Sequence, residues 1–460
     1  CNPLSFTSAQ THGNSKAGQN IPTSITDSSV STAYAGRVGT SVITVRGVSF
    51  AAVLGASGAT DNSGGDVGVN NASALSTGGD YGKSGNGSMA IIAQSIGAGG
   101  GISRQHLTNF DQSQTSVAMM LGGFGESNGN GANVTVTNNY ASSQSGWWIN
   151  TNTGSGSVAI LAQSIGGGGG LGMLTESTAG KGGSANLSIA LGGTDNSNGE
   201  SGFVTVNAGG HIQTSGAQSE AIIAQSISGG GGVAKVVINA ASSGAYASTG
   251  TPLTVSSSST NVSASAINGL AIGARMGSNS TDNSNAGIVT VNSKAAISTY
   301  GDMSKAIVAQ SIGNGGGIVD VTATNLNTGD FMASVNMGGS APGTVGNVSV
   351  TTTNTMITTG NNLADGIVAQ SITYGGGSFA VGDWGATFGG GTMNYLLGSP
   401  GMSSSPDASS VAVTAGSITT GGYGSSAITA QSIGGGGGIL NTKNEPGARA
   451  LIGGVSASAS

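Results

Sequence analysis

The chain contains little of what usually crosslinks, charges or interrupts a folded protein. It has one cysteine, Cys1, in 460 residues, so no disulfide can form within it. Prolines number only 7, aromatic residues make up 4% and charged residues 7%, against about 25% charged residues in an ordinary globular domain. No run of about 18 apolar residues occurs, so no membrane-spanning helix is predicted. Stability therefore has to come from packing of the chain, and solubility from serine, threonine, asparagine and glycine.

The few charged groups also exclude several functions. The net charge is −6 and the 12 basic residues are dispersed, so no basic cluster is present to bind nucleic acid through its phosphates. The histidines His12, His106 and His211 have no partner at a metal-ligand spacing, and the sequence has no adjacent pair of aspartates. Gly82–Ser84 lacks the earlier glycine that a phosphate-binding loop requires. We therefore expect no enzymatic activity and no cofactor.

What the chain does contain is one strand-like motif that occurs six times. In Ala159–Ile165, small residues alternate with β-branched and long apolar ones, which favours a strand, and a run of glycines follows. Glycine loses the most backbone freedom on ordering, so each copy predicts a strand followed by a turn or loop. The other copies are 90–96, 221–227, 306–312, 366–372 and 427–433.

The spacing of the copies sets the length of the repeat. Successive motif glutamines are 69, 62, 85, 60 and 61 residues apart, at Gln94, Gln163, Gln225, Gln310, Gln370 and Gln431. Between the copies lies a second marker, an apolar residue followed by glycine, as in Leu191-Gly192. The basic unit is therefore 61 residues, with 6 and 8 extra residues before the first and second motifs and 24 extra between the third and fourth.

Repetition of strands at this period predicts a solenoid. One coil of a β-solenoid takes on the order of 20 residues, so a 61-residue unit predicts about three coils and the 24-residue insertion about one more. The sequence thus predicts an all-β parallel β-helix (β-solenoid) over residues 48–460, made of six repeats and the start of a seventh at Ala450–Gly454. Residues 1–47 are rich in polar side chains and are predicted to form an N-terminal cap or entry segment.

Strand alternation assigns the two faces of the motif. We expect Ile91, Ala93 and Ser95 of the first copy to point inward. Three coils per repeat would hold the glutamines of neighbouring copies roughly 14 Å apart, too far for a side-chain ladder. Each glutamine is therefore expected to bond backbone groups of the glycine turn that follows it. A ligand-binding row of glutamines is the less favoured alternative.

Two further features are candidate sites. Asp61, Asp195 and Asp282 each begin an Asp-Asn-Ser sequence, which is typical of an Asx turn. A calcium row is the alternative, although each position offers a single carboxylate. Trp147 and Trp148 are adjacent in the second insertion, and one exposed ring could stack on a sugar or a protein partner. The other interpretation is a loop that folds one tryptophan over a coil edge.

The repeated motif, preceded by Val-Thr-Val and Ile-x-Thr strands as in 289–291 and 297–299, resembles the passenger region of large bacterial autotransporters. The resemblance covers about residues 50–460. It implies a right-handed β-helix that is secreted, displayed on the bacterial cell surface and used as an adhesin or structural stalk. It also implies an outer-membrane barrel outside this chain. Cys1 resembles the end of a bacterial lipoprotein, although we interpret it as simply the first residue of this stretch.

Three functions from different classes stay open. The first, which we expect, is a non-enzymatic extracellular surface protein that contacts a glycan or protein on a host or neighbouring cell. The second is a filament subunit that self-associates end to end. The third is a glycan- or ice-binding solenoid, which needs threonines aligned on successive coils, whereas Val-Thr-Val strands occur only once per repeat.

Overall fold

All regular elements of the described residues are strands, and the strands of each sheet run parallel in the computed structural model. No helix in this part of the chain is long and apolar enough to cross a bilayer. The structure describes residues 24–25, 33–34, 38–43, 49–54, 62–77, 85–108, 115–122, 128–138, 148–178, 185–192, 199–240, 269–277, 283–324, 327–339, 341, 343–384, 387–398, 407–442 and 448–452.

The six motif copies form one sheet, which we call the central sheet. Its strands are β7 (Ile91–Ile96), β12 (Ile160–Ile165), β17 (Ile222–Ile227), β22 (Ile307–Ile312), β26 (Ile367–Ile372) and β30 (Ile428–Ile433). Alternation of apolar residues makes each copy a strand, and identical registers bring equal positions of neighbouring copies together.

The Val-x-Val and Ile-x-Thr segments form a second sheet, the valine sheet. Its first strands are β5 (Val67–Asn71), β10 (Val134–Asn138), β15 (Val204–Ala208) and β20 (Val289–Ser293). Its second strands are β6 (Leu75–Thr77), β11 (Trp148–Thr151), β16 (His211–Thr214) and β21 (Ala296–Thr299). The two segments merge in β25 (Val348–Thr359) and β29 (Val411–Thr420).

Two more sheets complete the coils. The glycine sheet follows the glycine turns and contains β1 (Ser24–Ile25), β3 (Val38–Ile43), β8 (Gly100–Thr108), β13 (Gly169–Thr178), β18 (Gly231–Ala240), β23 (Gly316–Thr324), β27 (Gly376–Trp384) and β31 (Gly437–Thr442). The return sheet ends at the apolar-Gly markers and contains β2 (Ala33–Tyr34), β4 (Ser49–Leu54), β9 (Thr115–Leu121), β14 (Ala185–Leu191), β19 (Gly269–Met276), β24 (Asn327–Met337), β28 (Thr387–Leu397) and β32 (Ala448–Ile452).

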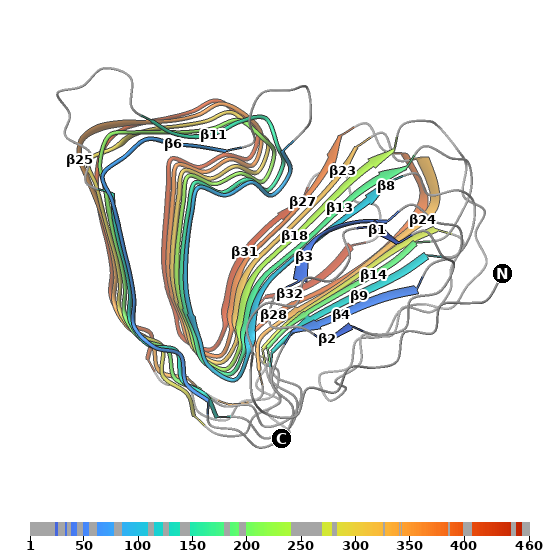
Figure 1. Cartoon of the computed structure of the whole chain (residues 1–460), viewed down its shortest axis with the longest axis horizontal. Helices are drawn as coiled ribbons and strands as arrows, with labels where there is room; N and C mark the ends of the chain where they lie inside the picture. The colour runs from blue at the N-terminus through green and yellow to red at the C-terminus, as the bar shows by residue number, and fades with distance from the viewer. Residues whose placement is uncertain are drawn as a thin grey trace, which may run out of the picture.

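One coil passes through the valine, central, glycine and return sheets in that order. Figure 1 looks along the stack, where the traces of successive coils overlie one another from blue to red. The central strands lie between the valine sheet and the glycine sheet, so both of their faces are covered. The predicted β-solenoid is therefore confirmed as the fold class, while the hand of the coil stays a prediction.

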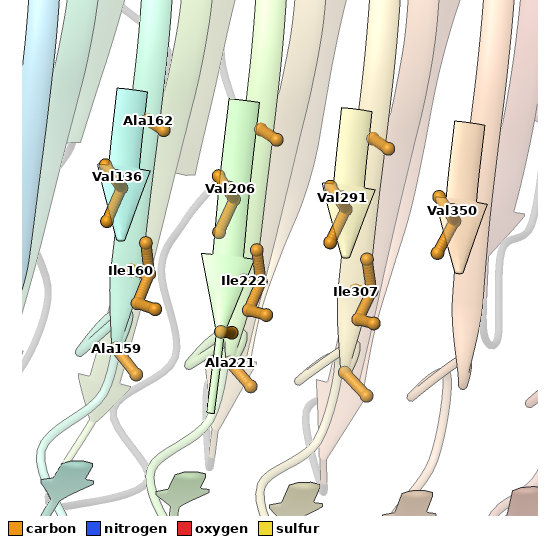
Figure 2. Close-up of a cluster of buried hydrophobic side chains, with 14 of the residues drawn as sticks. Val136, Ala159, Ile160, Ala162, Val206, Ala221, Ile222, Val291, Ile307 and Val350 are labelled. Carbon is orange, nitrogen blue, oxygen red and sulfur yellow. The ribbon is translucent and has the colours of Figure 1, made fainter. Parts of the chain in front are cut away.

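Among the described residues, an apolar core lies on each face of the central sheet. The first lies between the valine and central sheets and contains the predicted inward residues Ile91 and Ala93 with their equivalents. Figure 2 shows Val136, Val206, Val291 and Val350 at the same place on successive coils, with Ile160, Ile222 and Ile307 repeated in the same way. The second core lies towards the glycine sheet and contains Leu161, Ile223 and Val308 with Leu171 and Val233.

The second core corrects one sequence prediction. Only the face that carries Ile91, Ala93 and Ser95 was expected to point inward, yet Leu161, Ile223, Val308 and Val368 on the opposite face are all 0% exposed. A parallel strand that is covered on both faces buries every side chain, so its alternation marks two cores rather than an inside and an outside.

The prediction of three coils per repeat is wrong. Gln163 is paired in register with Gln94 on one side and Gln225 on the other, so each repeat makes a single wide coil. The 24-residue insertion adds no coil either, because β18 and β19 pair directly with β23 and β24 of the next repeat. Its extra residues fall within 241–268, outside the described residues. The six central strands therefore span about 25 Å along the axis.

The proposed division at residue 47 stays a prediction. Strands β1 and β3 of the predicted cap segment pair into the glycine sheet, and β3 lies beside β8. At the other end, β32 pairs with β28 and places Ile452 beside Leu397, the marker residue of the preceding coil. The start of a seventh unit stays a prediction.

Candidate functional site

The motif glutamines form a ladder along the whole central sheet. From Gln94 to Gln370, each Nε2 donates to the Oε1 of the glutamine in the next coil at 2.6–2.7 Å. Gln163, Gln225, Gln310 and Gln370 are 0% exposed. The expected bond to the glycine segment is present only as a longer second contact, as from Gln310 Nε2 to Gly317 O at 3.4 Å. The sequence argued against such a ladder because three coils per repeat would have kept the glutamines of neighbouring copies apart.

The motif serines join the central sheet to the segment that precedes the valine sheet. Ser226 Oγ donates to Gly202 O of its own coil at 2.8 Å and accepts from Gly287 N of the next coil at 2.7 Å. Ser311 repeats this arrangement with Gly287 O and Gly346 N, both at 2.9 Å. One hydroxyl per coil thus bridges two coils, which explains the serine of the motif as a structural residue.

The turn after each motif requires glycine where backbones of neighbouring coils meet. Gly231 has a φ of +142°, and a Cβ there would lie 2.2 Å from Gly316 O. A side chain at this position would therefore clash with backbone that has no room to move. The glycine run therefore lets the backbones of neighbouring coils pack closely.

Five ionisable side chains are buried together between the central and glycine sheets, and we call them the buried charge cluster. They are Glu220, Lys235, Lys305, Asp320 and Asp365, and each is 0–2% exposed. Glu220 and Lys235 form one ion pair, and Lys305 Nζ lies 3.3 Å from Asp320 Oδ1 in the next coil. Lys235 and Asp320 are register partners on β18 and β23, so the signs alternate across and along the stack.

Burial and the neighbouring charges shift the pKa values of this cluster. The pKa of Glu220 is raised to about 7, mainly by burial and also by the neighbouring Asp320, against the lowering effect of Lys235. Burial also raises the pKa of Asp365, which Lys305 partly offsets. For Lys305, burial disfavours the charge, but Asp320, Glu220 and Asp365 outweigh it and the pKa is raised.

The outer face of the valine sheet carries an ordered array of polar side chains. Thr135, Thr205, Thr290 and Ser349 occupy one register position on four successive strands. Two residues further on, a second row contains Thr137, Asn207, Asn292 and Thr351. The rows lie about 7 Å apart and their members about 4.8 Å apart along the stack. Sequence reasoning missed this alignment for the same reason as the ladder.

The predicted contact and calcium residues are only partly within the described residues. Trp148 is the first residue of β11 and pairs with His211, but its side chain is not described. Trp147 lies outside the described residues, as do Asp61, Asp195 and Asp282. Within the described ranges, no group of three His, Cys, Asp or Glu side chains has the arrangement of a metal site.

Comparisons with known proteins give no identification, because no family model, no curated protein and no solved structure matches the chain.

The buried charge cluster was not predicted from the sequence. A signal was present, since Glu220 and Lys235 are 15 residues apart and so are Lys305 and Asp320, on either side of a motif copy. The reversed order of the two signs in neighbouring repeats is the feature that would have predicted pairing.

Proposed function

We propose that this chain is part of a non-enzymatic extracellular protein of the bacterial surface, in which the solenoid is a structural stalk of the adhesin-like passenger type. The observation that carries the proposal is the use of the repeated polar residues. The motif glutamines bond one another and the motif serines bond backbone of adjacent coils. A repeat whose polar side chains serve the stack supports a scaffold rather than a reaction centre.

Location is tested with antibodies raised against the folded chain. Intact cells of the producing bacterium should be labelled as strongly as permeabilised cells, and added protease should remove the label. Labelling that requires permeabilisation would contradict the proposal. Adhesion is tested by coating beads with the chain and counting their binding to host cells against beads coated with a Gly231→Ala variant, which we expect to misfold.

Particle shape separates the stalk from the filament hypothesis. Electron microscopy of the purified chain should show separate particles about 35 Å thick along the stack, since the glycine and return sheets each contain eight strands. Filaments that lengthen with protein concentration would instead favour end-to-end self-association, which stays a prediction.

A second candidate function is supported by the polar array on the valine sheet. The sequence argument against a glycan- or ice-binding surface was that Val-Thr-Val strands occur once per repeat, but one repeat is one coil, so these strands are direct neighbours. Threonine hydroxyls and asparagine amides on a flat sheet could dock a polar lattice or an extended glycan.

Matched variants test this surface. Thr205→Tyr and Thr290→Tyr put bulk in the middle of the array, whereas Ser298→Tyr puts it on the neighbouring strand of the same sheet. A glycan-array or ice-recrystallisation signal that the first two variants reduce and the third retains would support this function. If the unmodified chain gives no signal in either assay, the second candidate function is refuted.

A further inference from the structure

The buried charge cluster contains more acidic groups than basic groups. It contains two lysines and three carboxyl groups, all closed off from solvent between the central and glycine sheets. A buried net charge is costly, so the cluster is neutral only if one carboxyl group keeps a proton. Glu220 Oε1 and Asp320 Oδ2 are buried without a hydrogen-bond partner, and a carboxyl group becomes a donor only when it is protonated.

The cluster also holds an amine against a carboxyl group. Lys305 Nζ lies 3.3 Å from Asp320 Oδ1, the separation of a buried ion pair, and the Cγ that an amine would attack is bonded to that oxygen. Asp320 belongs to β23, and Lys305 lies two residues before β22, so paired strands fix both side chains. Met303, Leu363 and Ala380 form a small apolar cluster in the same coils and keep this region dry.

We propose that Lys305 and Asp320 condense to form an intramolecular amide, an isopeptide bond within the coil. The ammonium of Lys305 first loses a proton, and the free Nζ lone pair then attacks Cγ of Asp320. The new C–N bond forms, one C–O bond of Asp320 breaks, and the oxygen leaves with two protons as water. The ammonium and carboxylate together supply every atom of the amide and the water, so no oxidant or cofactor takes part.

Two carboxyl groups flank this pair in the roles that the condensation needs. Asp365 is coupled electrostatically to Lys305, and its raised pKa makes it a suitable acceptor for the ammonium proton. Glu220 is coupled electrostatically to Asp320, and its pKa is raised to about 7, so it can supply a proton to the carboxyl group under attack. Because the ammonium is the resting form of Lys305, the reaction depends on this internal base.

The second ion pair holds the acid in place. Lys235 Nζ donates to Gln218 O and to Glu220 Oε2, which fixes one oxygen of the Glu220 carboxyl group beside its lysine. Lys305 is coupled electrostatically to both Glu220 and Asp365 as well as to Asp320. We therefore assign the amide to Lys305 and Asp320 rather than to Lys235 and Glu220. The bond would tie the start of a central strand to the glycine sheet across residues 305–320 and prevent the turn between them from opening.

Mass spectrometry of the intact, folded 460-residue chain tests the proposal. We expect a mass lower than that of the sequence by one water molecule, and a tryptic product in which the peptides of Lys305 and Asp320 are joined. Cleavage after Lys305 should be lost, because trypsin does not cut after an acylated lysine. A full-length mass equal to that of the sequence would overturn the proposal and leave the cluster as ion pairs.

Peptide mapping also separates the other sources of water loss. Asp365 precedes Gly366 and could cyclise alone, which would place the mass change in a single unjoined peptide. A crosslink between Lys235 and Glu220 would show that the amide forms in the other ion pair. Either outcome would overturn the Lys305–Asp320 assignment.

Variants then test the roles. Lys305→Arg and Asp320→Ala should keep the full mass, whereas Lys294→Arg, an exposed lysine in the same coil, should still lose one water. Glu220→Gln should slow bond formation after refolding by at least about tenfold, as expected for a lost general acid. An unchanged rate would remove Glu220 from the reaction. Circular dichroism establishes that each variant is folded.

Discussion

Replacing Gln225 by leucine breaks the glutamine ladder at a position that is fully buried. Gln225 Oε1 accepts from Gln163 Nε2, and Gln225 Nε2 donates to Gln310 Oε1, both at 2.7 Å. Leucine removes both bonds and leaves one donor and one acceptor without their ladder partner. A buried polar group left unpaired costs about 1–3 kcal/mol, so the two together cost about 2–6 kcal/mol. The added apolar surface returns about 1 kcal/mol. We therefore expect a net loss of about 1–5 kcal/mol.

The last rung of the ladder provides the matched control. Gln431→Leu breaks one bond, from Gln370 Nε2, and that donor keeps a contact of 3.4 Å with Gly377 O. Gln431 is also only half-buried, so water can replace the lost partner. We expect this variant to lose about 1 kcal/mol or less.

Urea unfolding followed by circular dichroism measures both variants, and amide hydrogen exchange locates the change. Faster exchange should be confined to β12, β17 and β22 in the Gln225→Leu chain. Equal losses in the two variants would refute the argument that an unpaired buried amide determines the cost. A chain with leucine at all six rungs should lose less per substitution than the single variant, because it leaves no amide unpaired.

Three further outcomes are expected. Gly231→Ala should reduce the yield of folded chain sharply, because its Cβ would lie 2.2 Å from backbone of the next coil, whereas Gly65→Ala, with nothing within 4 Å, should leave it unchanged; soluble expression measures both. Ser226→Ala should cost about 1–3 kcal/mol in urea unfolding, because Gly287 N loses its acceptor. In chains that keep the cluster as ion pairs, the free energy of unfolding should fall by about 3 kcal/mol as the pH rises from 4.5 to 7. The reason is that the pKa of Glu220 is about 7 in the native state and 4.5 in the unfolded state, so the native state binds the proton more tightly over this range. Glu220→Gln should flatten that pH dependence, and a flat profile in a chain whose mass shows no loss of water would contradict the assignment.

The repeat and its strands could be predicted from the sequence because both are local properties. Alternation of apolar residues makes a strand wherever it occurs, and identical copies have to occupy equivalent places in a repeated structure. The inward position of Ile91, Ala93 and Ser95 followed from this alternation, and all three are 5% exposed or less. The interruption of each motif by glycine followed from backbone entropy in the same way.

The path of the chain around the axis was decided only by the tertiary structure. A period of 61 residues is compatible with three narrow coils or one wide coil, because spacing along the chain does not say which strands face each other. The fold takes one wide coil, in which the central sheet lies between two others. That choice brings the glutamines of adjacent repeats to 2.6–2.7 Å, and it places Lys305 opposite Asp320 across two sheets. Contacts between residues that are distant in sequence depend on register and on sheet packing, and neither is encoded within any single repeat.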